Sequence, residues 1–332
     1  MRPVPDIAVR AAAAPPGPAW LRAAWLAALL AAYAALPLLL GEYAIYTAAQ
    51  VMIYAVATLG LDIVYGRAGQ LSLAHASFFG LGAYAAALAG PLALPLWAQP
   101  ELVVLLAVVA GAVVAVPTLR LSGLRLSLVT LLFGELFGWA IDHSGGLTGG
   151  SEGITVNSLT LGGFDSQNAL DAYLLAGALA AGATLLAVQL GRSQYGRRML
   201  AVRDSELASV SVGVPVVRTK IVAFIMSAVF AAVAGWVYAY VAGFVSPTTF
   251  DLFGSVNFLV AVILGGAGRV LGAWLGAAYI VLVPEAFTGL GYPNLFPILG
   301  GAVLIAVVLL LPGGLVEGAS LLLSAAARRV RA

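Results

Sequence analysis

The stretch Gly191–Lys220, GRSQYGRRMLAVRDSELASVSVGVPVVRTK, decides how the chain is organised, because it cannot lie in lipid. Six of the sixteen Lys and Arg residues fall within it, whereas long apolar runs flank it on both sides. Charged side chains inside a membrane span are costly and rare. The stretch is therefore predicted to lie in water between two membrane spans.

The rest of the sequence has the composition of a polytopic, all-α membrane protein. It is 62% hydrophobic and 9% charged, whereas a soluble domain carries about 25% charged residues. It contains no Cys, which excludes disulfides and thiolate metal sites. With only His75 and His143, a multi-histidine metal centre is not expected either, and no nucleic acid is expected as a partner.

Ten apolar segments are candidates for membrane spans, since a helix needs about 20 apolar residues to cross the hydrocarbon core. They are 20–40, 43–65, 71–90, 102–119, 124–142, 171–190, 219–244, 254–267, 270–288 and 295–311. Segment 71–90 is rich in Gly and Ser, and 254–267 is short, so either is a candidate for a broken or re-entrant segment. We expect a tail at 1–19, a membrane domain at 20–315 and a basic tail at 316–332.

The charges between the spans predict the orientation. With ten crossings and both termini inside, all sixteen Lys and Arg residues lie at or near the inner face. The charged residues of the outer loops are then all acidic. This is the positive-inside pattern. It places 191–220 inside and the Gly-rich loop 142–171 outside, where that loop is either a flexible connector or a docking surface.

Helix signals occur within the inner stretch. Asp204 or Ser205 is a candidate N-cap, Gly213 suits the position after a helix, and Pro215 prevents continuation. We predict two short amphipathic helices here. The arginines alone are explained by topology and contact with lipid headgroups, but the apolar face of Leu207, Ala208 and Val210 suits a groove on a soluble partner.

Polar residues inside the predicted spans are candidates for a substrate path or for interhelical hydrogen bonds. These candidates are Gln70, Ser72, His75, Ser77 and the deep carboxylate Glu135. Asp62 lies five residues before Arg67, which favours a structural ion pair, and Glu285 is close to the outer end of its span. The motif Gly66-Arg67-Ala68-Gly69 has a weak echo in Gly265-Gly266-Ala267-Gly268.

Several motifs, in order along the chain, resemble those of one family. They are the segment Gly66–Tyr84 (GRAGQLSLAHASFFGLGAY), Thr148-Gly149-Gly150-Ser151-Glu152-Gly153, the spaced residues Arg192 to Gly213, and Gly243-Phe244-Val245-Ser246-Pro247. The chain resembles the LivM-type permease subunits of bacterial ABC importers for branched-chain amino acids. The resemblance runs from about residue 45 to 315.

The resemblance implies a multi-pass protein of the bacterial inner membrane that is not an enzyme. It implies a heterodimer with a LivH-like permease, two cytoplasmic ATPases that hold the ATP and Mg²⁺, and a periplasmic binding protein. No phosphate-binding loop occurs in this chain, and no cofactor is expected on it. The ATPase-coupling residues implied are Gly196, Arg197, Arg203, Asp204, Glu206, Leu207, Ala208 and Gly213.

Gly149, Gly150, Ser151 and Glu152 are the implied docking residues for the binding protein. Two other functions stay open at this point. One is a urea or amide permease of the same family, and the other is a proton-coupled secondary transporter that uses Glu135 or Asp62. A membrane enzyme is disfavoured, because His75 and His143 are predicted on opposite sides of the membrane.

Overall fold

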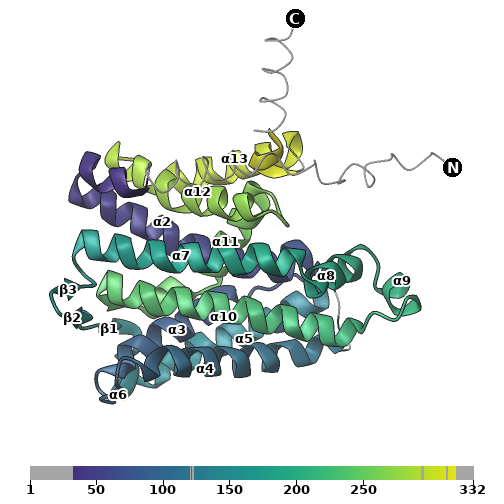
Figure 1. Cartoon of the computed structure of the whole chain (residues 1–332), viewed down its shortest axis with the longest axis horizontal. Coiled ribbons are helices and arrows are strands. Elements are labelled where there is room, and N and C mark those ends of the chain that lie inside the picture. The colour runs from purple at the N-terminus through teal and green to yellow at the C-terminus, as the bar shows by residue number, and fades with distance from the viewer. Residues whose placement is uncertain (1–32, 120, 122, 293–294, 312, 319–332) are drawn as a thin grey trace, which may run out of the picture. The chain divides into compact units, whose positions relative to one another are not determined.

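Long apolar helices, running between two polar ends, dominate the computed structural model of the chain (Figure 1). The structure describes residues 33–119, 121, 123–292, 295–311 and 313–318. The described part of residues 46–332 forms one compact unit, and residues 33–45 belong to a second unit. The predicted tail at 1–19, most of the predicted span 20–40 and most of the tail at 316–332 lie outside the described residues.

Six helices in the described residues are long and apolar enough to cross a membrane. They are α2 (Glu42–Leu61) with the π-helix that continues it (Asp62–Arg67), α4 (Ala98–Ala115), α5 (Leu124–His143), α7 (Ala169–Arg192), α10 (Val216–Ala242) and α12 (Val270–Gly289). Each coincides with a predicted span to within a few residues. The chain is therefore an all-α polytopic membrane protein.

Three further predicted spans form shorter helices: α3 (His75–Ala89), α11 (Leu252–Gly265) and α13 (Phe296–Leu310). At 1.5 Å per residue, helices of about 15 residues are shorter than the hydrocarbon core. The predicted segments 71–90 and 254–267 correspond to α3 and α11. α3 follows a non-helical segment at 68–74, and α11 follows a 3-10 turn (Pro247–Phe250) and Asp251. The continuous apolar run of a full span is interrupted before α3 by Gly69, Gln70 and Ser72, and before α11 by Ser246, Pro247 and Asp251.

The first turns of α3 and α11 meet, and the two helices then run toward opposite ends of the bundle. The N–H of Ala76 in α3 donates to Ser255 Oγ of α11 over 3.0 Å. The last residue of α11, Gly265, lies one turn before Gly268, which bonds to the end of α2. α3 ends instead beside the loop that carries Asn157. Two half-length helices thus meet near the middle of the bundle.

Small residues allow the central helix, α10, to pack closely on its neighbours. A Cβ at Gly235 of α10 would collide with the carbonyl of Phe79 in α3, and one at Gly111 of α4 would press on the backbone of Ile225. A Cβ at Gly276 of α12 would likewise collide with the backbone of Ala261 in α11. Small residues therefore let the backbones of these helices approach closely.

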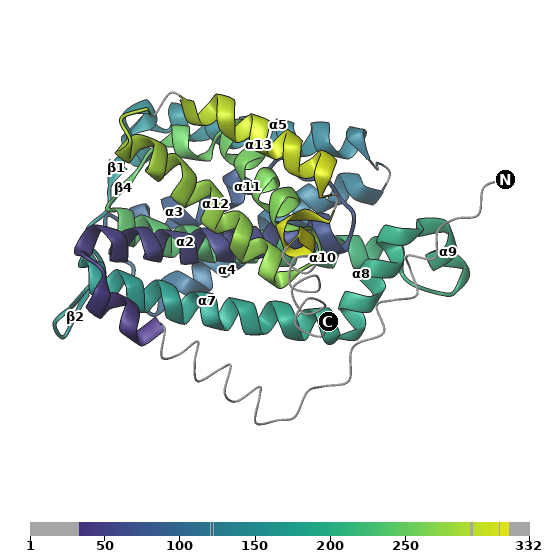
Figure 2. The ribbon, with the colours of Figure 1, turned by 90° about the horizontal axis from the view of Figure 1, so that it is seen from above.

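Short polar elements cover the two ends of the bundle. At one end lie α6 (Gly145–Thr148), a 3-10 turn (Gly150–Glu152) and three short strands, β1 (Ile154–Thr155), β2 (Thr160–Leu161) and β3 (Phe164–Asp165). β1 pairs antiparallel with β4 (Phe244–Val245), and β2 pairs with β3. At the other end lie α8 (Gln194–Asp204) and α9 (Glu206–Ser211), as Figures 1 and 2 both show.

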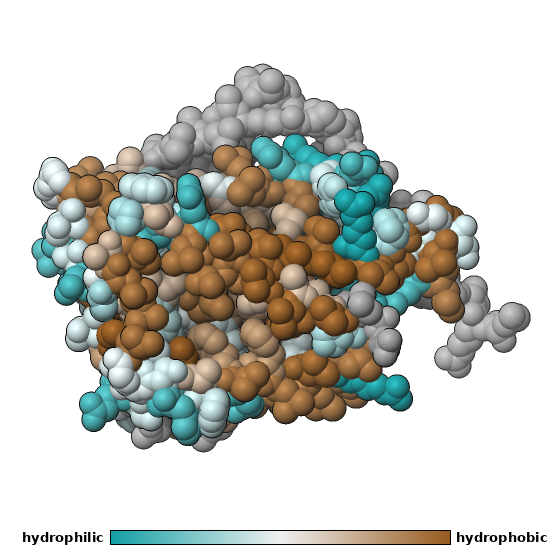
Figure 3. Space-filling model, turned by 90° about the horizontal axis from the view of Figure 1, so that it is seen from below, coloured by the Kyte–Doolittle hydropathy of each residue, from teal (hydrophilic) through white to brown (hydrophobic). Residues whose placement is uncertain are grey.

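The surface between the ends is apolar. On the face shown in Figure 3, hydrophobic residues form a broad band, and hydrophilic residues gather mainly toward the two ends. Exposed leucines on this helical surface include Leu105 in α4, Leu132 in α5 and Leu185 in α7. Apolar side chains left exposed around a whole helical bundle are stable only in lipid or against another apolar surface.

Candidate functional site

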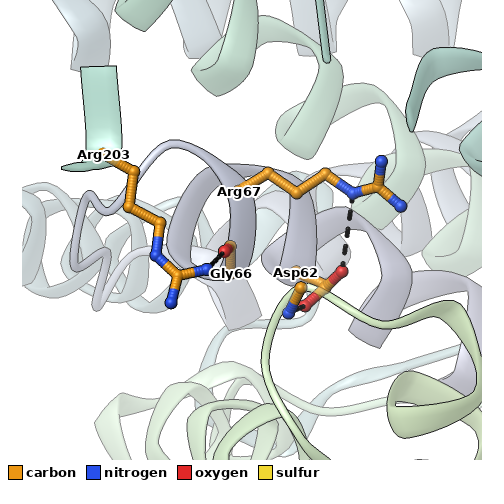
Figure 4. Close-up of polar contacts among 5 residues, drawn as sticks. Asp62, Gly66, Arg67 and Arg203 are labelled. Carbon is orange, nitrogen blue, oxygen red and sulfur yellow. Dashed lines mark hydrogen bonds and ion pairs between the residues drawn. The ribbon is translucent and has the colours of Figure 1, made fainter. Parts of the chain in front are cut away.

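Polar groups from three segments meet where α2 ends, close to α8 (Figure 4). Asp62 Oδ1 accepts a hydrogen bond of 2.6 Å from the backbone N–H of Gly268. Arg67 Nε lies 3.8 Å from Asp62 Oδ2, so the predicted ion pair is confirmed, although this distance is too long for a hydrogen bond. We call the cluster of Asp62, Gly66, Arg67, Arg203 and Gly268 the polar junction.

Glycine is required at two positions of the polar junction. A Cβ at Gly66 would collide with the Asp62 carboxylate and with the N–H of Gly268. Gly268 has φ +83°, a left-handed conformation that glycine adopts without strain. Gly66 opens the first of the two similar motifs in the sequence and Gly268 closes the second, so the structure brings the two motifs into contact.

α8 is attached to the polar junction. Its Arg203 donates a hydrogen bond from Nη1 to the carbonyl oxygen of Gly66. Met199 and Val202 are buried beneath the helix, and Ser193 caps its start by accepting from the N–H of Gly196 over 3.2 Å. Movement of α8 would therefore pull directly on the end of α2.

α9 turns its apolar side chains outward, in contrast to α8. Leu207 is 84% exposed and Val210 is 63% exposed. Of the two predicted caps, Ser205 is the one used, because its Oγ accepts from the N–H of Ala208 over 3.2 Å. The predicted pair of short helices and the exposed apolar face are thus present.

The charged residues of this stretch are used mainly inside the chain. Glu206 Oε1 lies 2.6 Å from Nζ of Lys220, whose side chain is 4% exposed. Arg197 donates to the carbonyl of Arg192 over 2.8 Å, and Asp204 is exposed at the end of α8. Gly196 is buried in the first turn of α8, and Gly213 follows α9 with φ +79°. Their predicted ATPase-coupling role stays a prediction.

Four of the predicted path residues lie buried around the start of α3. His75 is fully buried, with Nε2 2.7 Å from the carbonyl oxygen of Ala57 and Nδ1 3.4 Å from Ser227 Oγ. Ser77 is buried as well. The Oε1 atom of Gln70 and the Oγ atom of Ser72 are buried without a hydrogen bond among the described residues. The hydrogen bonds of His75 fit the interhelical alternative.

The fifth predicted path residue, Glu135, lies elsewhere. It is exposed on α5, together with Leu128, Leu132, Leu136 and Trp139. Among the described residues, its carboxylate makes no hydrogen bond or ion pair. Its possible role in a path therefore depends on what covers this face of α5.

The loop 142–171 is folded rather than a loose connector. Thr148 Oγ1 donates to the carbonyl of Ile141 over 2.7 Å and also accepts a hydrogen bond of 3.3 Å from the N–H of Gly150. Gly149 and Gly150 both have positive φ and shape the turn. Of the four predicted docking residues, Ser151 and Glu152 are exposed.

A cavity that the sequence analysis missed lies between α2, α11 and α12. Its two adjoining parts measure about 280 Å³ and 190 Å³ and share Tyr54, Asn257 and Ile280. Gln50, Asp251 and Glu285 add polar groups to its wall. The signal available in the sequence was an amide in each of two apolar spans, Gln50 and Asn257.

Comparison with known proteins relates this chain to membrane permeases. A family model described as branched-chain amino acid transport system / permease component matches residues 43–308. The high-affinity branched-chain amino acid transport system permease protein LivM of Salmonella typhimurium is 33% identical over 286 residues, which cover 79% of this chain and 67% of that protein. LivM of Escherichia coli gives the same identity and coverage.

A shorter match is to a permease that is named for a different substrate from that of LivM. The autoinducer 2 import system permease protein LsrC of Klebsiella pneumoniae is 33% identical over 127 residues, or 36% of this chain and 37% of that protein. No solved structure matches the chain. The family model covers most of the chain, including the polar junction and both short helices of the 191–220 stretch, and the chain therefore belongs to the branched-chain amino acid permease family.

Proposed function

We propose that the chain is a permease subunit of an ATP-driven importer of branched-chain amino acids in the bacterial inner membrane. The observation that carries this proposal is the pair α8 and α9. α8 is hydrogen-bonded to the helical bundle, and α9 exposes an apolar face. Such a pair suits the transfer of a conformational change from a soluble ATPase subunit to the membrane helices. The two LivM relatives support the choice of substrate class.

The α8 end of the bundle is proposed to face the cytoplasm, with both termini inside and ten membrane segments. Arg67, Arg203 and the residue after Gly268, Arg269, all lie at this end. The acidic loop with Glu152 and Asp165 lies at the opposite end (Figure 1). α3 and α11 count as two of the ten segments, each partly re-entrant.

An ATPase subunit is proposed to hold α9 through Leu207, Val210 and Val212. These three side chains are 84%, 63% and 76% exposed. A largely exposed apolar cluster at a cytoplasmic helix costs free energy until a partner groove covers it. A second ATPase would hold the equivalent helix of the partner permease.

A second, LivH-like permease is proposed to cover the open face of α5, with Glu135 facing the translocation path between the two subunits. The carboxylate would be costly against lipid. Ser151 and Glu152, at the opposite end from α9, are proposed to contact the periplasmic binding protein. The folded turn around Thr148 would hold both side chains in place.

The test of the proposal targets α9 rather than its charges, because Arg203 and Glu206 are bonded inside the chain. Leu207→Asp and Val210→Asp would be assembled with the partner subunits, and ATPase co-purification and leucine uptake measured. A buried apolar contact of at least ~2 kcal/mol predicts a loss of more than about tenfold for both readouts. Leu161→Asp, at the opposite end, is the control and should retain ATPase binding. Normal ATPase binding by both α9 variants would overturn the proposal.

A further inference from the structure

Two side-chain amides face the cavity between α2, α11 and α12 without a protein partner. Gln50 lies on α2 and Asn257 on α11, and neither makes a hydrogen bond with any described residue. Both belong to segments that otherwise read as membrane spans. Asn257 is exposed and Gln50 is partly buried in this chain alone. An amide without a hydrogen bond is costly wherever lipid or an apolar partner covers it, so both groups are suited to bind water or a polar ligand in the cavity.

The charge of the cavity wall has one sign. Asp251 and Glu285 contribute carboxylates, and no Lys, Arg or His lines either part of the cavity. Asp251 uses Oδ1 to cap α11 by accepting from the N–H of Gly254 over 2.9 Å, which leaves Oδ2 to face another group. A ligand with an ammonium group could pair with Asp251 Oδ2 and would meet no cationic side chain on the lining of the cavity.

The floor of the cavity is aromatic. The ring of Tyr54 stacks on Phe258 at 5.5 Å between centroids, and Phe79 packs against both, at 5.7 Å and 5.6 Å. His75 lies beyond this layer, edge-on to Phe258 at 5.2 Å. The rings close the cavity on the side of α3 and offer an apolar surface, with Ile280, to a hydrocarbon side chain.

We propose that this cavity is a binding site for one apolar α-amino acid in its zwitterionic form, within the permease chain itself. The ammonium group would face the carboxylates of Asp251 and Glu285. The amides of Gln50 and Asn257 would donate to the ligand carboxylate, and the apolar side chain would lie against Tyr54 and Ile280. The main part, at about 280 Å³, lies just below the ~300–1,000 Å³ of pockets for drug-sized ligands, as expected for a small metabolite.

This inference rests on the proposed function, since it names a place where the imported amino acid would stop. It also separates amino acids from urea and simple amides. Those molecules have neither an ammonium group for the two carboxylates nor an apolar chain for the aromatic floor. The site would hold substrate weakly, because a transporter must release what it binds.

The experiment uses saturation-transfer NMR on the assembled transporter in detergent, without the binding protein and with leucine at millimolar concentration. The wild type should show transfer to the leucine methyl protons. Leucine methyl ester, which keeps the ammonium group, should also show transfer, and 4-methylpentanoate, which lacks it, should not. Equal transfer to 4-methylpentanoate would overturn the assigned role of the carboxylates.

Matched variants locate the signal in the cavity. Ile280→Trp fills the cavity and should reduce the transfer at least fivefold, whereas Leu282→Trp places the same bulk elsewhere on α12 and should leave it unchanged. Asn257→Leu is a smaller change that should reduce the transfer at least threefold without loss of the partner permease. Equal signals for Ile280→Trp and Leu282→Trp, or loss of the partner permease in Asn257→Leu, would overturn the site.

Uptake assays on the same preparations separate the two proposals. If the wild-type transporter imports leucine with ATP but shows no cavity-dependent signal, the binding site is wrong and the proposed function stands. If it imports urea in place of leucine, the proposed function and the binding site both fail.

Discussion

The polar junction and the cavity both bring polar side chains together between apolar helices, but the hydrogen bonding of these side chains differs. At the junction, Asp62 and Arg203 each bond to a backbone group of another segment. In the cavity, the amides of Gln50 and Asn257 bond to no described residue. The hydrogen bonds of the junction are those of a structural contact between segments. The unbonded amides of the cavity are available to a ligand.

The difference has an energetic consequence. Removing one partner of a satisfied buried contact leaves the other group unpaired, which costs much more than the contact contributed. Removing a group that has no protein partner carries no such penalty. Stability measurements on the assembled transporter should therefore distinguish the two regions.

The largest effect is expected at Asp62. Asp62→Leu removes the acceptor for the N–H of Gly268 and leaves the charge of Arg67 buried without its partner. Breaking a buried ion pair from one side costs about 3–5 kcal/mol. The apparent melting temperature of the purified transporter should fall by several degrees or more, or the yield should collapse. Asp142→Leu, at an exposed position, is the control, and equal melting temperatures for the two would show that the junction is not a structural joint.

An intermediate effect is expected where the two short helices meet α10. Glu206→Gln leaves the buried Lys220 ammonium without a charged partner, whereas Lys220→Met leaves a carboxylate that is 42% exposed and can be hydrated. We expect a loss of about 1–3 kcal/mol for Glu206→Gln and a smaller loss for Lys220→Met. Thermal unfolding of both variants checks the order, and the reverse order would contradict this account of the pair.

The smallest effect on stability is expected in the cavity, and a second glutamine provides the comparison. Gln99 is buried, and both ends of its amide are bonded: Nε2 donates to Leu94 O, and Oε1 accepts from the Tyr240 hydroxyl over 2.6 Å. Gln99→Leu should cost about 1–3 kcal/mol, whereas Gln50→Leu should stay within ~0.5 kcal/mol of the wild type. A loss of similar size for both, measured by thermal unfolding, would show that Gln50 has a structural partner in the assembly.

Much of the local structure was predictable from the sequence. The helices α8 and α9, the stop at Gly213 and the pairing of Asp62 with Arg67 follow from signals only a few residues apart. Ser205 proved to be the cap in place of the alternative Asp204, because its hydroxyl reaches the N–H of Ala208. Signals of this kind are reliable because both interacting groups lie within one or two turns of chain.

The site residues were harder to predict. Gln70, Ser72, His75 and Ser77 were chosen because they are polar and close together in sequence; they lie buried and outside the proposed binding cavity, and their role in a path stays a prediction. Gln50 and Asn257 were missed because each is a single amide in an apolar run. Their meaning depends on the fact that they face the same cavity, although 207 positions separate them along the chain.

The sequence by itself determined the class of the protein, its main spans and the basic stretch between α7 and α10. Span length and charge are properties of single segments, so no knowledge of packing is needed to read them. Only the tertiary structure decided which polar groups are bonded and which are open. The bonds that matter join Arg203 to Gly66 across 137 positions and Gly268 to Asp62 across 206. Contacts over such separations are set by how the helices pack, which no local pattern specifies.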